Sequence, residues 1–288
     1  MFDSEVWREA SKIELALGGC FSTIKDSVGK VDTSYYICNS KEWIYATEVQ
    51  YDTYKQECSE FGQIIHGNVN PKYAYFCYGN EWKRFYGNES ITYGKLVDAR
   101  DGHVYRTVKV GGYIWMAENL NYADEKESPN LVDNNWCYEG DSVSCSMGRY
   151  YTWAAALDIS SDYNYSVAPA ETVKNSHRGI CAKGWHIPNR DEWDALFSAH
   201  EGDWYAMQAK NFASWQHATD IYGFSVIPNG YADDGYCEEY GSCAFFWSAT
   251  ERSSVLAYSW AVYSWDSWLH YNYTKIHKAS VRCVKDEE

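Results

Sequence analysis

The sequence predicts an α+β protein in which small disulfide-linked β-hairpin repeats precede a larger domain. Three observations lead to this class. Four positions in the first 95 residues recur at an offset of 38 or 39 residues. Two helical segments lie between residues 147 and 200, and the chain from Gly223 onward reads as short strands and turns. The composition agrees, because 27 Tyr, 14 Trp and 10 Phe stand against nine Leu, and aromatic residues favour strands.

The repeats organise the first third of the chain. We assign residues 1–19 to a partial repeat, 20–57 to a first complete repeat and 58–95 to a second. The recurring pairs are Trp43 and Trp82, Cys38 and Cys77, Tyr54 and Tyr93, and Cys20 and Cys58. Because each repeat then contains two cysteines, we expect the disulfides Cys20–Cys38 and Cys58–Cys77. Modules of this size need such a bridge, since they bury too little core without it.

The larger domain covers residues 96–288. Its first part is expected to form two strands, with hairpin turns at Asp101-Gly102 and Gly111-Gly112. Residues 147–159 have helical spacing, with one face formed by Tyr150, Trp153, Ala154 and Leu157. In a second helix Asn189 is the N-cap and Glu192 completes a capping box. The buried stripe of that helix is formed by Trp193, Leu196 and Phe197.

Charge excludes several classes of partner. The chain carries 25 Lys+Arg and 40 Asp+Glu, a net charge of −15, without a basic stripe. Phosphate binding depends on clustered basic residues, so we expect no nucleic acid and no anionic membrane surface as partner. No apolar run is long enough to cross a bilayer, which predicts no direct membrane insertion.

Cysteine usage predicts an oxidising compartment. The ten cysteines are even in number and form no CxxC or CxxH pair, so five disulfides would use them all. The alternative is ten free thiols in a cytosolic protein. We expect a secreted or cell-surface protein. The first residues carry no export signal, and we expect one to have been removed.

Six ordered motifs carry a family resemblance. They are VYRTVKVGGYIWMAENLNY, GRYYTWAAALD, ICAKGWHIPNRDEWDAL, YGFSVIPNGY, FWSATE and SVRCVKD. Over about residues 96–286 the chain resembles the Fibrobacter succinogenes major paralogous domain, a bacterial extracellular module. That family looks like a member of the C-type-lectin-like superfamily, which implies two helices and two sheets with paired N- and C-terminal strands. The preceding repeats resemble the Cys/Trp modules that often accompany it.

The resemblance also implies the remaining disulfides and a limit on activity. It pairs Cys181 with Cys283. It also implies two short-range disulfides, Cys137–Cys145 and Cys237–Cys243, each of which would hold a local loop in place. HIPNRDEW is also similar to formylglycine-generating enzymes, but their late redox-active cysteine pair has no counterpart here. That oxidase activity therefore does not carry over.

Catalytic patterns are missing, and we expect a protein that is not an enzyme. The eight His are scattered, without an HExxH motif, and no GxSxG motif occurs. We expect His186 to be a packed, hydrogen-bonded core residue. Asp191 and Glu192 belong to the first turn of a helix, where negative charge is favourable.

An acidic loop and an aromatic hairpin are the candidate binding features. Calcium would bind through Asp233, Asp234, Glu238 and Glu239, although a solvated loop without any cofactor is the preferred interpretation. In the segment 257–274, alternation places Tyr258, Trp260 and Val262 on one face and Ser259, Ala261 and Tyr263 on the other. Trp247 and Trp260 are expected in the core. The predicted ligand-binding residues are Tyr263, Trp265, Asp266, Trp268, Tyr271, Tyr273, Asp233 and Asp234.

Exposed rings beside polar groups favour sugar binding, because sugar rings offer apolar faces for stacking and hydroxyl groups for hydrogen bonds. The first hypothesis is therefore a non-catalytic module that recognises glycans, such as plant cell-wall polysaccharide, or mediates adhesion. The alternative is a structural or protein-interaction module of a bacterial surface assembly, with a surface protein as partner. The hairpin is also similar to the variable region of retroelement-diversified lectin-like proteins, which bind diverse ligands.

Overall fold

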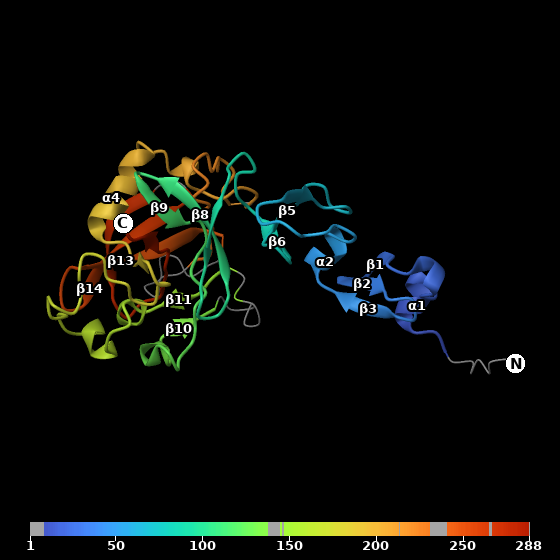
Figure 1. Cartoon of the computed structure of the whole chain (residues 1–288), viewed down its shortest axis with the longest axis horizontal. Coiled ribbons are helices and arrows are strands. Elements are labelled where there is room, and N and C mark those ends of the chain that lie inside the picture. Colours follow the sequence, from blue (N-terminus) through green and yellow to red (C-terminus); the bar gives the residue numbers. More distant parts are fainter. Residues whose placement is uncertain are drawn as a thin grey trace, which may run out of the picture. The chain divides into compact units, whose positions relative to one another are not determined.

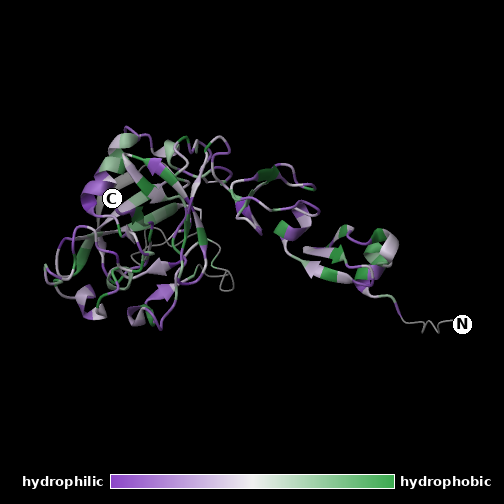
Figure 2. Cartoon of the chain, in the orientation of Figure 1, coloured by the Kyte–Doolittle hydropathy of each residue, from purple (hydrophilic) through white to green (hydrophobic). Residues whose placement is uncertain are grey.

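The computed structural model describes residues 9–137, 145, 147–212, 214–230, 241–264 and 267–287, with only the backbone for 267–272. The chain forms two compact units, Met1–Phe85 and Tyr86–Glu288 (Figure 1). The described part is mostly sheet with a few short helices, in line with the predicted α+β class. Hydrophobic and hydrophilic residues are interspersed along the strands of both units (Figure 2). The second unit starts ten residues before the predicted boundary at residue 96, because β7 and its lead-in belong to it.

The two repeats of the first unit share one strand order. Each contains a three-stranded antiparallel sheet, β1-β2-β3 in the first repeat and β4-β5-β6 in the second. A short helix, α2, connects them. The elements are α1 (Lys12–Leu17), the 3-10 turn η1 (Ser22–Ile24), β1 (Val28–Val31), β2 (Ser34–Cys38), β3 (Trp43–Ala46), α2 (Glu48–Asp52), β4 (Ile64–His66), β5 (Ala74–Cys77) and β6 (Trp82–Phe85).

Equivalent indole hydrogen bonds close both repeats. The Nε1 of Trp43 donates to the carbonyl of Gly18 at 2.8 Å, and the Nε1 of Trp82 donates to the carbonyl of Gln56 at 2.9 Å. In each repeat the indole therefore ties the last strand to the segment that precedes the first cysteine. This shared bond explains why Trp recurs at the offset seen in the sequence.

The first and last strands of the second unit, β7 and β17, belong to one five-stranded sheet with the order β12-β17-β9-β8-β7. Its strands are β7 (Gly94–Val97), β8 (Val104–Val110), β9 (Tyr113–Met116), β12 (Trp185–His186) and β17 (Val284–Lys285). The expected turns at 101–102 and 111–112 form, but they separate three strands rather than two. Gly111 and Gly112 have φ of 61° and 89°, a conformation that glycine adopts without strain. The last strand, β17, pairs with β9.

A six-stranded sheet has the order β10-β11-β16-β13-β14-β15. Its strands are β10 (Asn135–Trp136), β11 (Tyr150–Tyr151), β13 (Cys243–Glu251), β14 (Leu256–Tyr263), β15 (Ser267–Thr274) and β16 (Ala279–Ser280). β15 lies at the edge, and its pairing with β14 shifts register between Ser259 and Ala261. The predicted hairpin therefore forms, with an irregularity near its middle.

The two predicted helices differ in outcome. In α4 (Arg190–Ala199) the capping box between Asn189 and Glu192 is confirmed. The predicted helix over 147–159 is too long, because its first residues form β11 and only α3 (Trp153–Ala156) is helical. Asp158, at φ 53°, follows its end. The 3-10 turns of this unit are η2 (Pro129–Leu131), η3 (Ser161–Asn164) and η4 (Trp204–Ala206).

Core residues cover both faces of β13 and β14. On one face Phe245 stacks on Tyr273, with ring centroids 5.0 Å apart. On the other face α4 places Trp193 5.1 Å from Trp260. Trp247 and Trp260 are 0% and 1% exposed, which confirms both as core residues.

The disulfides agree with the predicted pairing. The bridges that the structure describes are Cys20–Cys38, Cys58–Cys77, Cys137–Cys145 and Cys181–Cys283. Cys243 is also disulfide-bonded, whereas its predicted partner Cys237 lies outside the described residues. The Cys181–Cys283 bridge spans 102 residues, a loop length at which chain entropy contributes about 4.7 kcal/mol.

Candidate functional site

Two rings of the predicted hairpin site are buried. Tyr263 is 9% exposed and lies 5.9 Å from Phe245, edge to face. Tyr273 is 1% exposed and lies between Phe245 and Trp247. The expectation that Tyr263 and Tyr273 offer free ring faces is therefore wrong. The two rings are buried because the sheet is covered on both sides, so side chains that alternate along the strand are covered on either face.

The other predicted site residues have no described side chain. The backbone of Trp268 pairs with Ala261, and that of Tyr271 pairs with Ser259. Outside the described residues lie Trp265, Asp266, Asp233, Asp234, Glu238 and Glu239. Within the described part of the chain, no group of three His, Cys, Asp or Glu residues could hold a metal ion. None of the described helices is long and apolar enough to span a membrane.

A concave site that the sequence did not indicate lies in the first unit, where α2 meets the second repeat. We call it the repeat cleft, and it has a volume of about 160 Å³. Its walls come from β1, β2, α2 and the loop before β5. The lining residues are Lys30, Tyr35, Glu48, Tyr51, Asp52, Val69 and Asn70.

Two tyrosine rings form one wall of the repeat cleft. Tyr35 of β2 and Tyr51 of α2 have ring centroids 4.7 Å apart at an angle of 38°, and both rings are half-buried. The Nζ of Lys30 lies 4.8 Å from the Tyr35 centroid and 3.4 Å from its hydroxyl. The wall is therefore aromatic, with an ammonium group at its edge.

The floor of the cleft is a buried carboxylate. Asp52 ends α2 and is 1% exposed. Its Oδ1 accepts from the backbone N–H of Val69 at 2.9 Å and of Asn70 at 2.8 Å. Its Oδ2 accepts from the Tyr75 hydroxyl at 2.7 Å. Burial and this bond raise the pKa of Tyr75, so its hydroxyl remains a donor. Asp52 thus fixes the second repeat against α2 and shapes the cleft.

Local sequence explains why α2 presents these groups. Thr47 accepts from the N–H of Gln50, and the Gln50 side chain accepts from the N–H of Thr47. This capping box sets the start of a helix of only five residues. Gly67 faces Asp52 so closely that a Cβ on it would lie 2.1 Å from Oδ2. The sequence signal for the cleft is thus a capped turn followed by an acid and, in the next repeat, a glycine.

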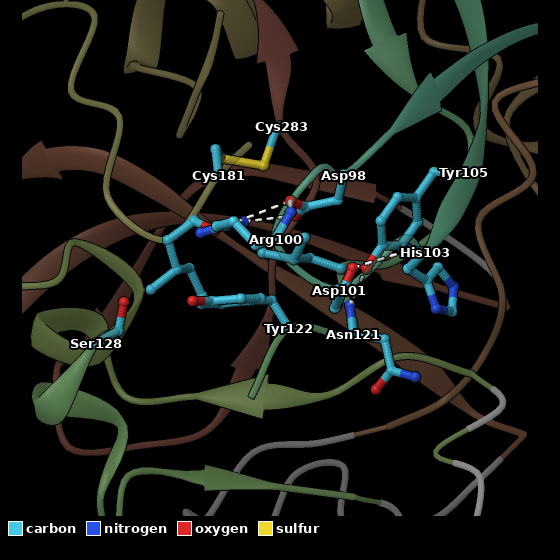
Figure 3. A network of polar contacts seen from close by, with 12 residues as sticks. Asp98, Arg100, Asp101, His103, Tyr105, Asn121, Tyr122, Ser128, Cys181 and Cys283 are labelled. Atoms are coloured by element: carbon cyan, nitrogen blue, oxygen red, sulfur yellow. Dashed lines mark hydrogen bonds and ion pairs between the residues drawn. A yellow bond between two sulfur atoms is a disulfide. The ribbon is translucent and has the colours of Figure 1, made fainter. Parts of the chain in front are cut away.

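A largely buried ion pair lies after the first strand of the second unit. Arg100 pairs with Asp98 through two nitrogens, at 2.9 and 2.6 Å, and donates to the Ile180 carbonyl at 2.8 Å. Its guanidinium lies 3.6 Å from the Tyr122 centroid, near the Cys181–Cys283 bridge (Figure 3). Burial opposes the charge of Asp98, but its bonds with Arg100 outweigh burial and lower its pKa. This network anchors the turn after β7.

A second buried acid has a raised pKa. Asp220 is 0% exposed and accepts from the N–H and the hydroxyl of Ser225, both at 2.7 Å. Burial raises the pKa of Asp220 to about 7, opposed by Ser225 and by the charges of Arg106 and Arg282. Raised pKa values often mark active sites. Here the carboxyl is fully enclosed, so no substrate reaches it.

His186 agrees with its predicted role. The ring is 3% exposed and lies between Glu192 and Asp286, at 2.8 and 2.7 Å. Both ring nitrogens are used within the protein, which confirms a packed, hydrogen-bonded core residue.

Comparison with known proteins gives one match. No curated protein and no solved structure matches the chain. The family model of the Fibrobacter succinogenes major domain matches residues 108–285, which is more than half of the 288 residues. This range contains both sheets except β7 and the first residues of β8, together with α3 and α4. The chain therefore belongs to the Fibrobacter succinogenes major domain family.

Proposed function

We propose that this chain is a non-catalytic, secreted or cell-surface module that binds glycans, with neutral plant cell-wall polysaccharide as the ligand class. The observation that carries the proposal is the repeat cleft with its two tyrosine rings. The four described disulfides support an oxidising compartment. A C-type-lectin-like fold for the second unit is also part of the proposal, supported by the pairing of β17 with β9.

The cleft has the groups that sugar recognition needs. The rings of Tyr35 and Tyr51 offer apolar faces to the C–H groups of a sugar. Lys30, Glu48 and Asn70 line the same cleft and supply hydrogen-bonding groups for hydroxyls. Pockets for drug-sized ligands measure roughly 300–1,000 Å³. A cleft of about 160 Å³ therefore suits one sugar unit of a longer chain.

Charge selects neutral sugars over acidic ones. The lining includes one cation, Lys30, and two carboxylates, Glu48 and Asp52. The whole chain adds a net charge of −15. A uronate-rich polymer would be repelled by this field, whereas cellulose and xylan backbones carry no charge. Binding should accordingly depend little on ionic strength.

The hairpin residues form a second part of the proposal. Trp265, Asp266, Trp268 and Tyr271, with Asp233 and Asp234 of the acidic loop, are proposed to contact a ligand at the second unit. Calcium binding by the acidic loop is the weaker part of this proposal. Variants at the two places distinguish them, because the cleft and the hairpin belong to different units.

Binding to insoluble polysaccharide tests the proposal. Pull-down on cellulose and xylan, with a glycan array, should compare the wild type with Tyr35→Ala/Tyr51→Ala and Trp265→Ala/Trp268→Ala. Tyr45→Ala is the matched control, since Tyr45 is 70% exposed and does not line the cleft. Loss of at least about ten-fold in affinity in the cleft variant alone supports the cleft. Unchanged binding in that variant refutes it, and loss only in the hairpin variant assigns binding to the hairpin.

A protein-interaction module is the second candidate, favoured by exposed apolar side chains on three neighbouring segments of the second unit. Four large exposed side chains directly precede or follow Ser166, Ser254 or Lys275, and the carbonyls of both serines contact the Lys275 ammonium group. These are Tyr165, Val167, Val255 and Ile276, with exposed fractions of 68%, 61%, 43% and 39%. Apolar surface gathered in one place is typical of interaction sites. Absence of binding to every polysaccharide, together with capture of a surface protein that Tyr165→Ser/Ile276→Ser abolishes, would favour this function.

A further inference from the structure

Lys275 is a buried cation in a cage of oxygen atoms. The residue is 0% exposed and follows β15 directly. Its Nζ donates to the carbonyls of Tyr163 at 2.9 Å, Ser166 at 3.1 Å and Ser254 at 3.2 Å. It also forms a close ion pair with Oε1 of Glu251. Burying an ammonium group costs several kcal/mol unless it is paired. Here the carboxylate and the three carbonyl oxygens provide that pairing.

The cage contains more acceptors than a lysine needs. An ammonium group has three protons, but four oxygen atoms from two segments, 163–166 and 251–254, surround it. On another side the Trp153 ring centroid lies 4.5 Å away, a cation–π contact. One carboxylate and several carbonyls arranged around a point is the ligand chemistry that calcium takes in proteins.

The backbone holds the cage in place independently of the lysine side chain. Glu251 Oε1 also accepts from the N–H of Ala168 at 3.0 Å. The N–H of Lys275 donates to the Val255 carbonyl at 3.0 Å, and its own carbonyl accepts from the N–H of Trp153 at 2.9 Å. These bonds connect the two segments that supply the oxygens to each other and to the backbone of Lys275, so the positions of the oxygens are largely fixed before any cation is bound.

We propose that this cage is a cation-binding site whose resident cation is the Lys275 ammonium, and that it accepts Ca²⁺ once the side chain is shortened. Removal of the fully buried stem of Lys275 would leave a cavity in which water molecules complete the six to eight oxygen ligands of calcium. In the wild type the chain supplies its own cation, and the segments around the cage are fixed without a metal.

Two substitutions at Lys275 distinguish the effect of losing the ammonium charge from the effect of opening space in the cage. Lys275→Ala removes both the charge and the stem, whereas Lys275→Met removes the charge but fills the cavity. Lys109→Ala, at an exposed position of β8, is the control. The full chain is heated in a calorimeter with EDTA and again with millimolar CaCl2, and the melting temperature of the second unit is recorded.

Lys275→Ala should melt below the wild type in EDTA and regain about 4 °C or more with calcium, the scale expected for a ligand well above its Kd. Wild type, Lys275→Met and Lys109→Ala should each respond to calcium much less than Lys275→Ala. A calcium shift in Lys275→Ala no larger than in the wild type overturns the proposal. If Lys275→Ala does not fold in EDTA, the yield after refolding with and without calcium replaces melting. Equal yields then overturn it.

Discussion

The Nε2 of His186 lies 2.8 Å from Oε1 of Glu192, inside a core where the ring is only 3% exposed. Its Nδ1 lies 2.7 Å from Oδ1 of Asp286. A neutral imidazole donates from one nitrogen only, so two carboxylates favour the imidazolium. Burial lowers the pKa of His186, but the bonds with Glu192 and Asp286 outweigh burial and raise it above 6.5.

This arrangement predicts stability that declines in mildly alkaline solution. Because the folded pKa of His186 is raised, its contribution is complete below pH 6.5 and is lost as pH rises through the folded pKa. His186→Gln should lower the free energy of unfolding by roughly 1–3 kcal/mol at pH 6 and by less at pH 8.5. Urea unfolding of both proteins across this range measures the difference. A difference that stays constant with pH would contradict the assignment.

Asp220 predicts a second pH effect at lower pH. Its raised pKa, about 7, means that the folded state binds more protons than the unfolded state between about pH 4 and pH 7. The free energy of unfolding should therefore fall as pH rises through this window, by on the order of 4 kcal/mol. Asp220→Asn cannot ionise and should lack this decline. Parallel curves for the two proteins would show that Asp220 titrates normally.

Loss of the Asp52 carboxylate should lower the free energy of unfolding of the first unit, because this group bonds α2 to the second repeat. Asp52→Ala leaves the N–H groups of Val69 and Asn70 and the Tyr75 hydroxyl without their acceptor. Each such group costs about 1–3 kcal/mol, so the first unit should lose at least about 2 kcal/mol. Asp32→Asn is the control, because Asn tolerates the φ of 54° at this position. It removes only the charge that Asp32 contributes to an exposed ion pair with Lys12, which should contribute less than about 1 kcal/mol. Equal effects of the two substitutions would refute the role of Asp52.

The two classes of disulfide should differ in their contribution. Cys181→Ser/Cys283→Ser opens a loop of 102 residues and should cost about 4.7 kcal/mol. Cys20→Ser/Cys38→Ser opens a loop of 18 residues and should cost about 3 kcal/mol. Calorimetry should show the first pair affecting only the transition of the second unit. A larger loss from the short loop would contradict the ranking.

Local patterns predicted the parts of the fold that depend on near neighbours. The capping box of Asn189 and Glu192 marked α4 because both partners lie within one helical turn. Disulfides of the repeats followed from their offsets, and the turns at 101–102 and 111–112 from their glycines. The predicted helix over 147–159 was wrong in its first part, because β11 pairs there with β10 and with β16, and β16 lies far away along the chain.

The candidate site depended on contacts that no local pattern contains. Burial of Tyr263 and Tyr273 follows from what covers the second face of the sheet. The repeat cleft joins Tyr35 and Tyr51 with a loop of the next repeat, so neither repeat alone predicts it. No sequence motif singles out Lys275, because two of the oxygens that surround it come from residues more than 100 positions earlier in the chain.

The pairing of β17 with β9 sets the order in which the second unit can mature. Its five-stranded sheet lacks an inner strand, and its longest disulfide lacks Cys283, until the final residues are available. During synthesis from the N-terminus the two repeats are able to fold first, whereas the second unit cannot complete its five-stranded sheet until its last residues have been made. Any fused partner or tether at the C-terminal side must therefore begin after Asp286, because β17 and the bond of Asp286 with His186 are both needed to complete the unit.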